Sequence, residues 1–477
     1  MKSLKNKIPK NLSLFEKLFL LVPFAIWFSY WPNFHFGKSE GANLEFSLPL
    51  ILCVILAVVA IYEILRQFRR NSQIILKDRA ILLTGGFVVW NFLTIFWGFN
   101  PLRTFLTAGI WAVLWVIFVK LKISSRAKKL YPLFTHNLIL ASGIVSILTI
   151  LQVAIGAFTD WGLCRGCVAS GFGFARPSLF AIEPQFLGSL LLAPILLVWW
   201  KILSGEKTKF NFWALGLSLI ALYLTLSRGA IFAVVPAMLL GVLVAPKNKL
   251  RFFKRLAILV ACLTVSFTSG MLWHALWTEL NPRVSDGFYD SINKSVNQLS
   301  LGKISLPKAQ PVEKPVENQP SKNSPQTESS PKTEPQTQNS PQKASFDGYV
   351  EKSTDERTKL SSLALQTWQQ NPRTILLGVG AGGAGKAILQ ITGQIASAGE
   401  IVQNEFLSIL LELGIVGLAI WLAIWLDFIW QTRSNRIGWL ILLAFMLQWF
   451  FFSGLPNALH IYLILAIFFA QNSAAKN

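Results

Sequence analysis

The 477-residue sequence has few of the residues on which soluble and secreted proteins depend. Only 14% of its residues are charged, and it contains four cysteines and four histidines, whereas soluble domains carry about 25% charged residues. The low charge excludes a soluble enzyme and a disordered chain, and the low cysteine count excludes a disulfide scaffold. Because no histidine lies at a metal-binding spacing from another, we expect no protein-held metal.

Apolar and aromatic residues are abundant instead. Hydrophobic residues make up 53% of the chain, with 36 Phe and 18 Trp, and many apolar runs reach the roughly 20 residues that a transmembrane helix needs. The predicted fold class is all-α membrane protein, a polytopic bundle of about 12 transmembrane helices with one large periplasmic loop. The predicted spans are 14–31, 47–65, 79–98, 104–120, 132–157, 179–200, 211–227, 229–245, 256–277, 403–430, 437–454 and 456–470.

These spans divide the chain into three regions. Nine transmembrane helices occupy 1–277, the large loop occupies 278–402, and three transmembrane helices occupy 403–477. Basic residues are unevenly distributed among the loops: with the N-terminus inside, inner segments hold 26 Lys and Arg, short outer loops hold five, and 278–402 holds 13. Inner loops are enriched in Lys and Arg, and long loops are exempt from this rule.

We therefore expect a multi-pass protein of the inner (plasma) membrane with both termini cytoplasmic and the large loop outside. The first apolar run is followed by Trp31-Pro32 rather than by small residues, so it is expected to remain as an anchor instead of being cleaved. The net charge of +21 is then a consequence of topology and does not indicate nucleic-acid binding.

The large loop changes composition along its length. Residues 278–302 have the composition of a polar loop, and residues 303–345 are rich in Pro, Ser, Gln and Lys. Such a low-complexity stretch cannot bury a core, so it is predicted to be a disordered tether without a site. Ordered structure is expected to return at 350.

Residues 350–372 are predicted to form an amphipathic helix. Ser353 and Glu356 have the spacing of a capping box, apolar residues then recur every three or four positions as far as Trp368, and Asn371-Pro372 ends the pattern. The helix is expected to lie on the outer membrane face or to pack over the bundle, with Trp368 buried.

A run of five glycines in eight residues follows at 378–385. It contains the spacing of a dinucleotide-binding loop, but an outer loop lacks the strand and the distal acid that this motif requires. Two interpretations remain: its backbone amides approach a phosphate, or it is a flexible hinge leading into the tenth span.

Two arginines lie where a charge is costly. Arg228 separates two apolar helices at their outer tips, and Arg176 opens the sixth span, with Glu183 one turn deeper. Charged residues within spans are functional candidates by default, and the planar guanidinium fork suits bidentate phosphate binding. The alternative is that each arginine only extends to the membrane surface.

Polar residues of the last spans are also candidates. Glu405 and Glu412 are seven residues apart in the tenth span, so they share one helix face. They could pair with the arginines, or one could serve as a base; alternatively, Glu412 only holds helices together. His460, near the outer end of the last span, is a minor candidate base.

The four cysteines fall into two groups. Cys53 and Cys262 lie in predicted spans and are expected to be packing residues. Cys164 and Cys167 share an outer loop, where a local disulfide and two free thiols are both open.

Three blocks of sequence together resemble one known family. They are Leu226-Ser227-Arg228-Gly229-Ala230, the helix of Arg357 with Trp368, Asn371-Pro372 and Gly378-Val379-Gly380, and the segment from Asn404 to Gly417. In this order and topology they are similar to the O-antigen ligase and O-antigen polymerase superfamily. These are bacterial integral-membrane glycosyltransferases that use undecaprenyl-diphosphate-linked glycans, and the resemblance extends from about residue 75 onward.

The resemblance implies a metal-independent glycosyltransferase without a cofactor. It assigns Arg176, Arg228 and Arg357 to the diphosphate of the lipid-linked donor, while an acceptor hydroxyl attacks the anomeric carbon. Cations at this place stabilise charge that develops on the leaving group. The implied partners are an undecaprenyl-diphosphate-linked oligosaccharide, an acceptor glycan and the lipid bilayer, with a flippase and a chain-length regulator as further candidates.

The sequence departs from the family at one position. Family ligases usually carry His-Asn where this chain has Gln403-Asn404, and glutamine is not a general base. Either Glu405 or Glu400 replaces the histidine, or the reaction relies on stabilising the leaving group.

A further pattern bears on the type of enzyme. Arg176-Pro177 followed by Glu183-Pro184 looks more like polymerases of exopolysaccharide or O-antigen than like ligases. Two other classes stay open: a membrane transporter of inorganic carbon or a small solute, and a non-catalytic assembly partner.

Overall fold

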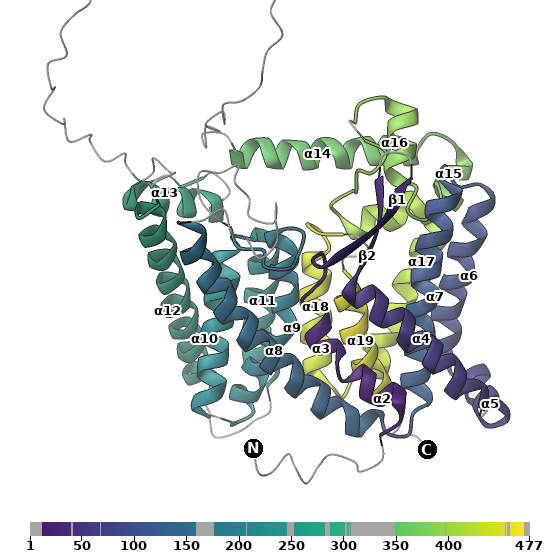
Figure 1. Cartoon of the computed structure of the whole chain (residues 1–477), viewed down its shortest axis with the longest axis horizontal. Helices are drawn as coiled ribbons and strands as arrows, with labels where there is room; N and C mark the ends of the chain where they lie inside the picture. Colours follow the sequence, from purple (N-terminus) through teal and green to yellow (C-terminus); the bar gives the residue numbers. More distant parts are fainter. Residues whose placement is uncertain are drawn as a thin grey trace, which may run out of the picture.

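The computed structural model describes residues 12–39, 42–66, 68–158, 176–206, 208–245, 252–281, 287–300, 303–304, 306, 349–395, 397–453, 455 and 458–471. This part of the chain is mostly helical, with one two-stranded hairpin (Figure 1). Its elements are α2 (Leu14–Phe19), α3 (Val22–Ala25), β1 (Asn33–Ser39), β2 (Ala42–Ser47), α4 (Leu48–Arg66), α5 (Phe68–Lys77), α6 (Arg79–Leu93), η1 (Thr94–Phe96), α7 (Pro101–Ile123), α8 (Ala127–Gly156), α9 (Pro184–Leu203), α10 (Lys209–Leu224), α11 (Arg228–Val244), α12 (Phe252–Glu279), α13 (Phe288–Leu299), α14 (Tyr349–Trp368), α15 (Pro372–Leu377), α16 (Ala384–Thr392), α17 (Glu405–Gln431), α18 (Arg436–Gln448) and α19 (Leu459–Gln471).

Eleven of the twelve predicted spans coincide with apolar helices. Within the described residues, seven of these helices have the length and composition to cross a membrane: α4, α6 with η1, α7, α8, α9, α12 and α17. Four are shorter: α10, α11, α18 and α19. The chain is therefore a multi-pass helical membrane protein.

The predicted span 14–31 is wrong as a single helix. The chain forms two short helices, α2 and α3, that are separated at Leu20 and Leu21. Pro23 lies in the first turn of α3, where its missing N–H is tolerated, whereas inside a longer helix it would clash with the preceding turn. The antiparallel hairpin β1–β2, which the composition did not predict, follows.

The helix predicted at 350–372 starts and ends elsewhere. It already begins at Tyr349 as α14, so Ser353 lies inside the helix and is not its N-cap. At the other end, Asn371 accepts the Thr374 amide at 3.0 Å and caps a new helix, α15, with Pro372 at its first position. Leu363 and Ala364 on α14 are buried against α16 and α17, so this helix packs over the bundle. Trp368, which was predicted to be buried, is only partly buried.

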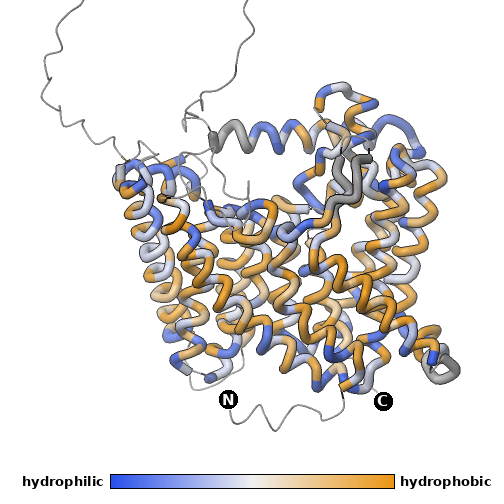
Figure 2. Tube along the Cα trace, viewed as in Figure 1, coloured by the Kyte–Doolittle hydropathy of each residue, from blue (hydrophilic) through white to orange (hydrophobic). Residues whose placement is uncertain are grey.

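The bundle is organised around α9. In α9, 89% of an apolar stretch of 18 consecutive residues is buried, whereas only 17% of the corresponding stretch of α12 is buried. Helix α9 is therefore central and α12 is peripheral. α9 packs against α8, α10, α11 and α18. Apolar residues cover the middle of the bundle and polar residues gather at its two ends (Figure 2).

The two ends of the bundle differ. Helices α13 to α16 lie at one end, which we call the α14 end, and α2 and α5 lie at the opposite end (Figure 1). Four ion pairs lie at the α5 end, where they connect α2, α4, α6, α7 and α17 or the residues that flank them: Glu16–Arg126, Glu63–Lys120, Asp78–Lys122 and Asp427–Arg79.

The glycine run is fixed against its neighbours rather than free as a hinge. The Val379 amide donates to the Leu411 carbonyl and the Gly380 amide to the Glu412 carbonyl, both at 2.9 Å. Gly414 interrupts α17 with φ of +68°, and a Cβ on it would lie 2.2 Å from the Leu376 carbonyl oxygen. Glycines on both sides therefore allow the backbones to touch, and helix α16 separates the run from α17.

Candidate functional site

Three arginines that are far apart in sequence line one polar pocket at the α14 end. Arg176 precedes α9, Arg228 opens α11 and Arg357 lies on α14, and the pocket encloses about 410 Å³ of space that is partly open to solvent. The other lining residues are Gln185, Leu226, Ser227, Gly229, Gln298, Gln448, Phe451 and Phe452. We call this the arginine pocket.

Arg176 is held by the end of a helix. Its Nε and Nη2 donate to the Thr225 carbonyl at 3.0 and 2.9 Å, so its guanidinium caps the C-terminal end of α10. The prediction that Arg176 opens the sixth span is wrong, because α9 begins only at Pro184. Glu183 is the N-cap residue of α9 rather than a residue one turn inside it.

Arg228 is placed by two close backbone approaches. It is the first residue of α11, after the buried Ser227. A Cβ on Gly229 would lie 2.9 Å from Phe451 Cβ, and one on Gly188 would lie 3.0 Å from Ser227 Cβ. Small residues at these positions thus bring the start of α11 against α9 and the segment after α18.

Arg357 connects α14 to α9. Its Nη2 donates to Gln185 Oε1 at 3.3 Å, and Gln185 Nε2 donates to Glu183 Oε2 at 2.7 Å. Glu183 therefore supports Arg357 through one glutamine. This chain of contacts ties the helix over the bundle to the rim of the pocket.

The arrangement creates a positive potential. The first turns of α9 and α11 both contribute lining residues, and the N-terminal end of a helix carries a partial positive charge that attracts anions. Three guanidinium groups around one pocket repel one another, and a bound polyanion would offset that repulsion. Chemically, the pocket is suited to a phosphate or diphosphate.

The two acids of α17 have other partners. Glu405 is buried and accepts the Tyr462 hydroxyl at 2.7 Å, while the Glu412 carboxylate accepts the Gly382 amide at 2.7 Å. Tyr462 and the glycine run are therefore partners of these two acids. The glycine run, considered above as a phosphate loop, holds the carboxylate of Glu412 instead.

The remaining candidate bases lie outside the arginine pocket. Glu400 is exposed before α17, and neither it nor Gln403 is among the lining residues. Asn404 is the N-cap of α17, since its Oδ1 accepts the Leu407 amide at 3.0 Å. Helix capping thus explains why an asparagine stands at position 404.

His460 reaches the pocket indirectly. It is buried in the first turn of α19, and its Nε2 lies 2.9 Å from Ser189 Oγ. Ser189 Oγ in turn donates to Gln448 Oε1 at 2.8 Å, and Gln448 lines the arginine pocket.

Sequence reasoning missed the three glutamines of the pocket. Gln448 had a usable signal, since it is a buried polar residue in an apolar span. Gln185 likewise stands in the first turn of an apolar helix. Gln298 gave no such signal, because residues 278–302 were interpreted as loop and its helix, α13, was not predicted.

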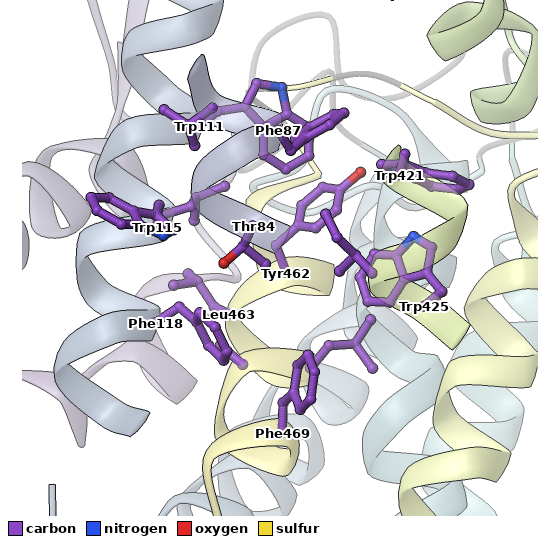
Figure 3. Close-up of a pocket in the computed structure, with 15 residues that line it drawn as sticks. Thr84, Phe87, Trp111, Trp115, Phe118, Trp421, Trp425, Tyr462, Leu463 and Phe469 are labelled. Atoms are coloured by element: carbon purple, nitrogen blue, oxygen red, sulfur yellow. The ribbon is translucent and has the colours of Figure 1, made fainter. Parts of the chain in front are cut away.

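A second pocket is apolar and lies between α6, α7, α17 and α19 (Figure 3). It encloses about 650 Å³ of space that is partly open, and most of its lining is aromatic or aliphatic. We call it the aromatic pocket; its aromatic residues are Phe87, Trp111, Trp115, Phe118, Trp421, Trp425, Tyr462 and Phe469.

The end of α18 lies between the two pockets. Gln448 and Phe452 line the arginine pocket, while the ring of Trp449 lies 4.9 Å from that of Trp421 and 5.3 Å from that of Trp425. Consecutive residues at the end of α18 therefore contact the linings of the two pockets.

The cysteines and possible metal ligands add no further site. Cys53 and Cys262 are free thiols in α4 and α12, which agrees with packing roles. Cys164 and Cys167 lie outside the described residues. Among the residues that are described, no group of three His, Cys, Asp or Glu side chains is arranged to hold a metal ion.

The fold and the pocket define a polytopic helical membrane protein with arginines gathered at one end of its bundle. Residues 213–422, just under half of the chain, match the model of the O-antigen ligase family, which supports the resemblance to the O-antigen ligase and polymerase superfamily. Members of the family are glycosyltransferase-like ligases and polymerases of the inner membrane that act on lipid-linked glycans. A search of curated proteins finds no match.

Proposed function

We propose that this protein transfers a glycan from undecaprenyl diphosphate to a sugar hydroxyl, as a polymerase of surface polysaccharide or exopolysaccharide. The observation that carries the proposal is the convergence of Arg176, Arg228 and Arg357 on one pocket. The family match covers Arg228 and Arg357, and Arg176 comes from outside the matched segment.

In the proposed reaction the diphosphate lies in the arginine pocket. The acceptor hydroxyl oxygen bonds to the anomeric carbon, the bond from that carbon to the diphosphate oxygen breaks, and the hydroxyl proton is released to solvent. Undecaprenyl diphosphate leaves with one more negative charge, which the three guanidinium groups and the starts of α9 and α11 stabilise. Because Glu400, Gln403 and Glu405 lie outside the lining, stabilisation of the leaving group is the main catalytic contribution that we assign.

The aromatic pocket supplies an apolar environment on the other side of Trp449. Transfer of an isoprenoid chain out of water or disordered lipid is favourable in free energy only where apolar side chains surround the chain. We propose that part of the polyprenyl chain occupies this pocket while the diphosphate occupies the arginine pocket.

The distribution of basic residues supports one orientation in the membrane. The predicted inner segments, with most of the Lys and Arg of the short loops, adjoin the helix ends at the α5 end (Figure 1). Arg357 of the arginine pocket lies on α14, at the other end. We propose that the α14 end faces the periplasm, where a flipped lipid-linked glycan is presented. A flippase and a chain-length regulator are the expected partners.

The lipid-linked glycans of a strain that lacks the protein test this function. Polymerase activity predicts that single repeat units accumulate on the polyprenyl carrier, and that the wild-type gene restores long chains. Long chains that remain on the carrier would instead indicate a ligase. An unchanged profile would contradict glycan transfer and would direct attention to transport.

A further inference from the structure

Beside its arginines, the arginine pocket contains three glutamines from three different helices. They are Gln185 on α9, Gln298 on α13 and Gln448 on α18. An amide side chain has two donors and a carbonyl acceptor, a combination that matches sugar hydroxyl and acetamido groups rather than phosphate. Their surroundings decide which of them face a ligand.

Gln185 is occupied within the protein. Its Oε1 accepts from Arg357 and its Nε2 donates to Glu183. Both ends of its amide are therefore used to position Arg357.

Gln448 is held in one orientation. The single hydroxyl hydrogen of Ser189 is donated to Gln448 Oε1, so at the 2.9 Å contact with His460 the serine oxygen must accept and the ring Nε2 must donate. All three residues are buried. With its carbonyl turned toward Ser189, Gln448 offers its amide hydrogens to the pocket.

Gln298 offers the opposite group. Its side chain is only 4% exposed, and its Oε1 has no hydrogen-bond partner within the described part of the chain. A buried acceptor without a donor costs about 1–3 kcal/mol, so this oxygen in the lining of a pocket indicates a ligand that donates a hydrogen bond.

We propose that Gln298 and Gln448 recognise the hydroxyl or amide groups of the sugar that is bonded to the diphosphate, and so select which lipid-linked glycan enters the pocket. His460 and Ser189 are positioning residues that fix the amide of Gln448. The inference rests on the proposed function, because the sugar reaches these residues only when the diphosphate binds among the arginines of the same pocket.

Binding of two probes to the purified full-length protein in nanodiscs tests the selection. The probes are undecaprenyl diphosphate without a sugar and the lipid-linked glycan isolated from a strain that lacks the protein. Gln298→Met removes the acceptor and keeps the length of the side chain. It is expected to weaken binding of the glycan-carrying lipid about tenfold and to change binding of undecaprenyl diphosphate by less than about twofold.

Controls separate the possible failures. Gln366→Met, at an exposed position on α14, should change neither affinity. Equal losses for both probes in Gln298→Met, or no loss for either, would overturn the inference. If Arg228→Ala leaves the affinity for undecaprenyl diphosphate unchanged, the proposed function itself fails.

A third probe identifies which sugar is recognised. The same glycan released from its lipid carrier contains the sugar without the diphosphate. If Gln298→Met weakens binding of this free glycan as much as binding of the lipid-linked one, the recognised sugar belongs to the acceptor, and the assignment to the donor is wrong.

The positioning role of His460 has its own readout. His460→Ala is expected to raise KM for the lipid-linked glycan while kcat changes little, because Gln448 loses its fixed orientation. His460→Gln, which keeps an N–H donor, should restore KM. Equal losses of kcat in both variants would show a structural role only.

Discussion

At the residue scale, Gly414 and Gly378 determine whether the segment between α15 and α16 can touch α17. Gly414 has φ of +68°, and a Cβ there would lie 2.2 Å from the Leu376 carbonyl oxygen. Gly378 has φ of +77°, and a Cβ there would lie 2.3 Å from the Glu412 carbonyl oxygen. Each therefore needs both the left-handed backbone and the space that only glycine provides.

We predict that Gly414→Ala destabilises the protein by about 3 kcal/mol or more, since it adds strain and a clash with backbone that cannot move aside. Gly86→Ala is the matched control, because Gly86 lies in α6 and a Cβ there meets nothing within 4 Å; its effect should be within about 1 kcal/mol. The fraction of detergent-solubilised protein that stays monomeric after heating measures both. If the two variants lose monomeric protein equally on heating, the contact between Gly414 and the end of α15 does not stabilise the protein.

Individual residues also show how far the sequence could predict the site. Arg176 and Arg228 were identifiable because charges at the edges of apolar spans are costly, and Arg357 was identified through resemblance; all three line one pocket. Gln298 was not identifiable in this way, because it lies in a segment that was interpreted as a polar loop, where a glutamine is not costly. The partners of Glu405 and Glu412 come from elements more than 25 residues away, a proximity that helix periodicity does not contain.

At the element scale, apolar length predicted eleven helices well and failed where backbone chemistry intervenes. Hydropathy alone does not show that a new helix, α3, begins around Pro23, or that α9 begins only at Pro184. It also missed α5 and α13, because both are polar enough to be interpreted as loops.

The aromatic pocket lies between four helices and gives a second prediction. Ala466 on α19 lines this pocket, so Ala466→Leu fills part of it. We expect KM for an undecaprenyl-linked glycan to rise about fivefold to tenfold, since roughly 1 kcal/mol of apolar contact is lost, while KM for the same glycan on a short, five-carbon isoprenoid changes little.

A matched change on the outside of the bundle controls for added bulk. Ala419 is exposed on α17, and Ala419→Leu should leave both KM values unchanged. If Ala466→Leu affects the short and the long lipid equally, the aromatic pocket does not hold the polyprenyl chain.

At the scale of the whole molecule, charge is divided between the two ends of the bundle. Four carboxylates at the α5 end are in ion pairs, such as Glu63–Lys120 at 2.8 Å, whereas at the α14 end the lining of the arginine pocket combines three guanidinium groups with polar amides. Charges paired between helices hold those helices together, whereas converging cations attract an anionic ligand. The division supports a protein that works from one face of the membrane.

Turnover by the purified protein in liposomes, supplied with a lipid-linked glycan and with acceptor, tests most directly whether glycan transfer takes place at the arginine pocket. Wild type and Arg373→Ala, an exposed arginine close to α14, should lengthen the glycan and release undecaprenyl diphosphate at equal rates. Arg228→Ala should reduce kcat at least a hundredfold, as expected when about 3 kcal/mol of leaving-group stabilisation is removed. Full turnover by Arg228→Ala, or no glycan transfer by the wild-type protein, would contradict the claim that the arginine pocket is the site of transfer.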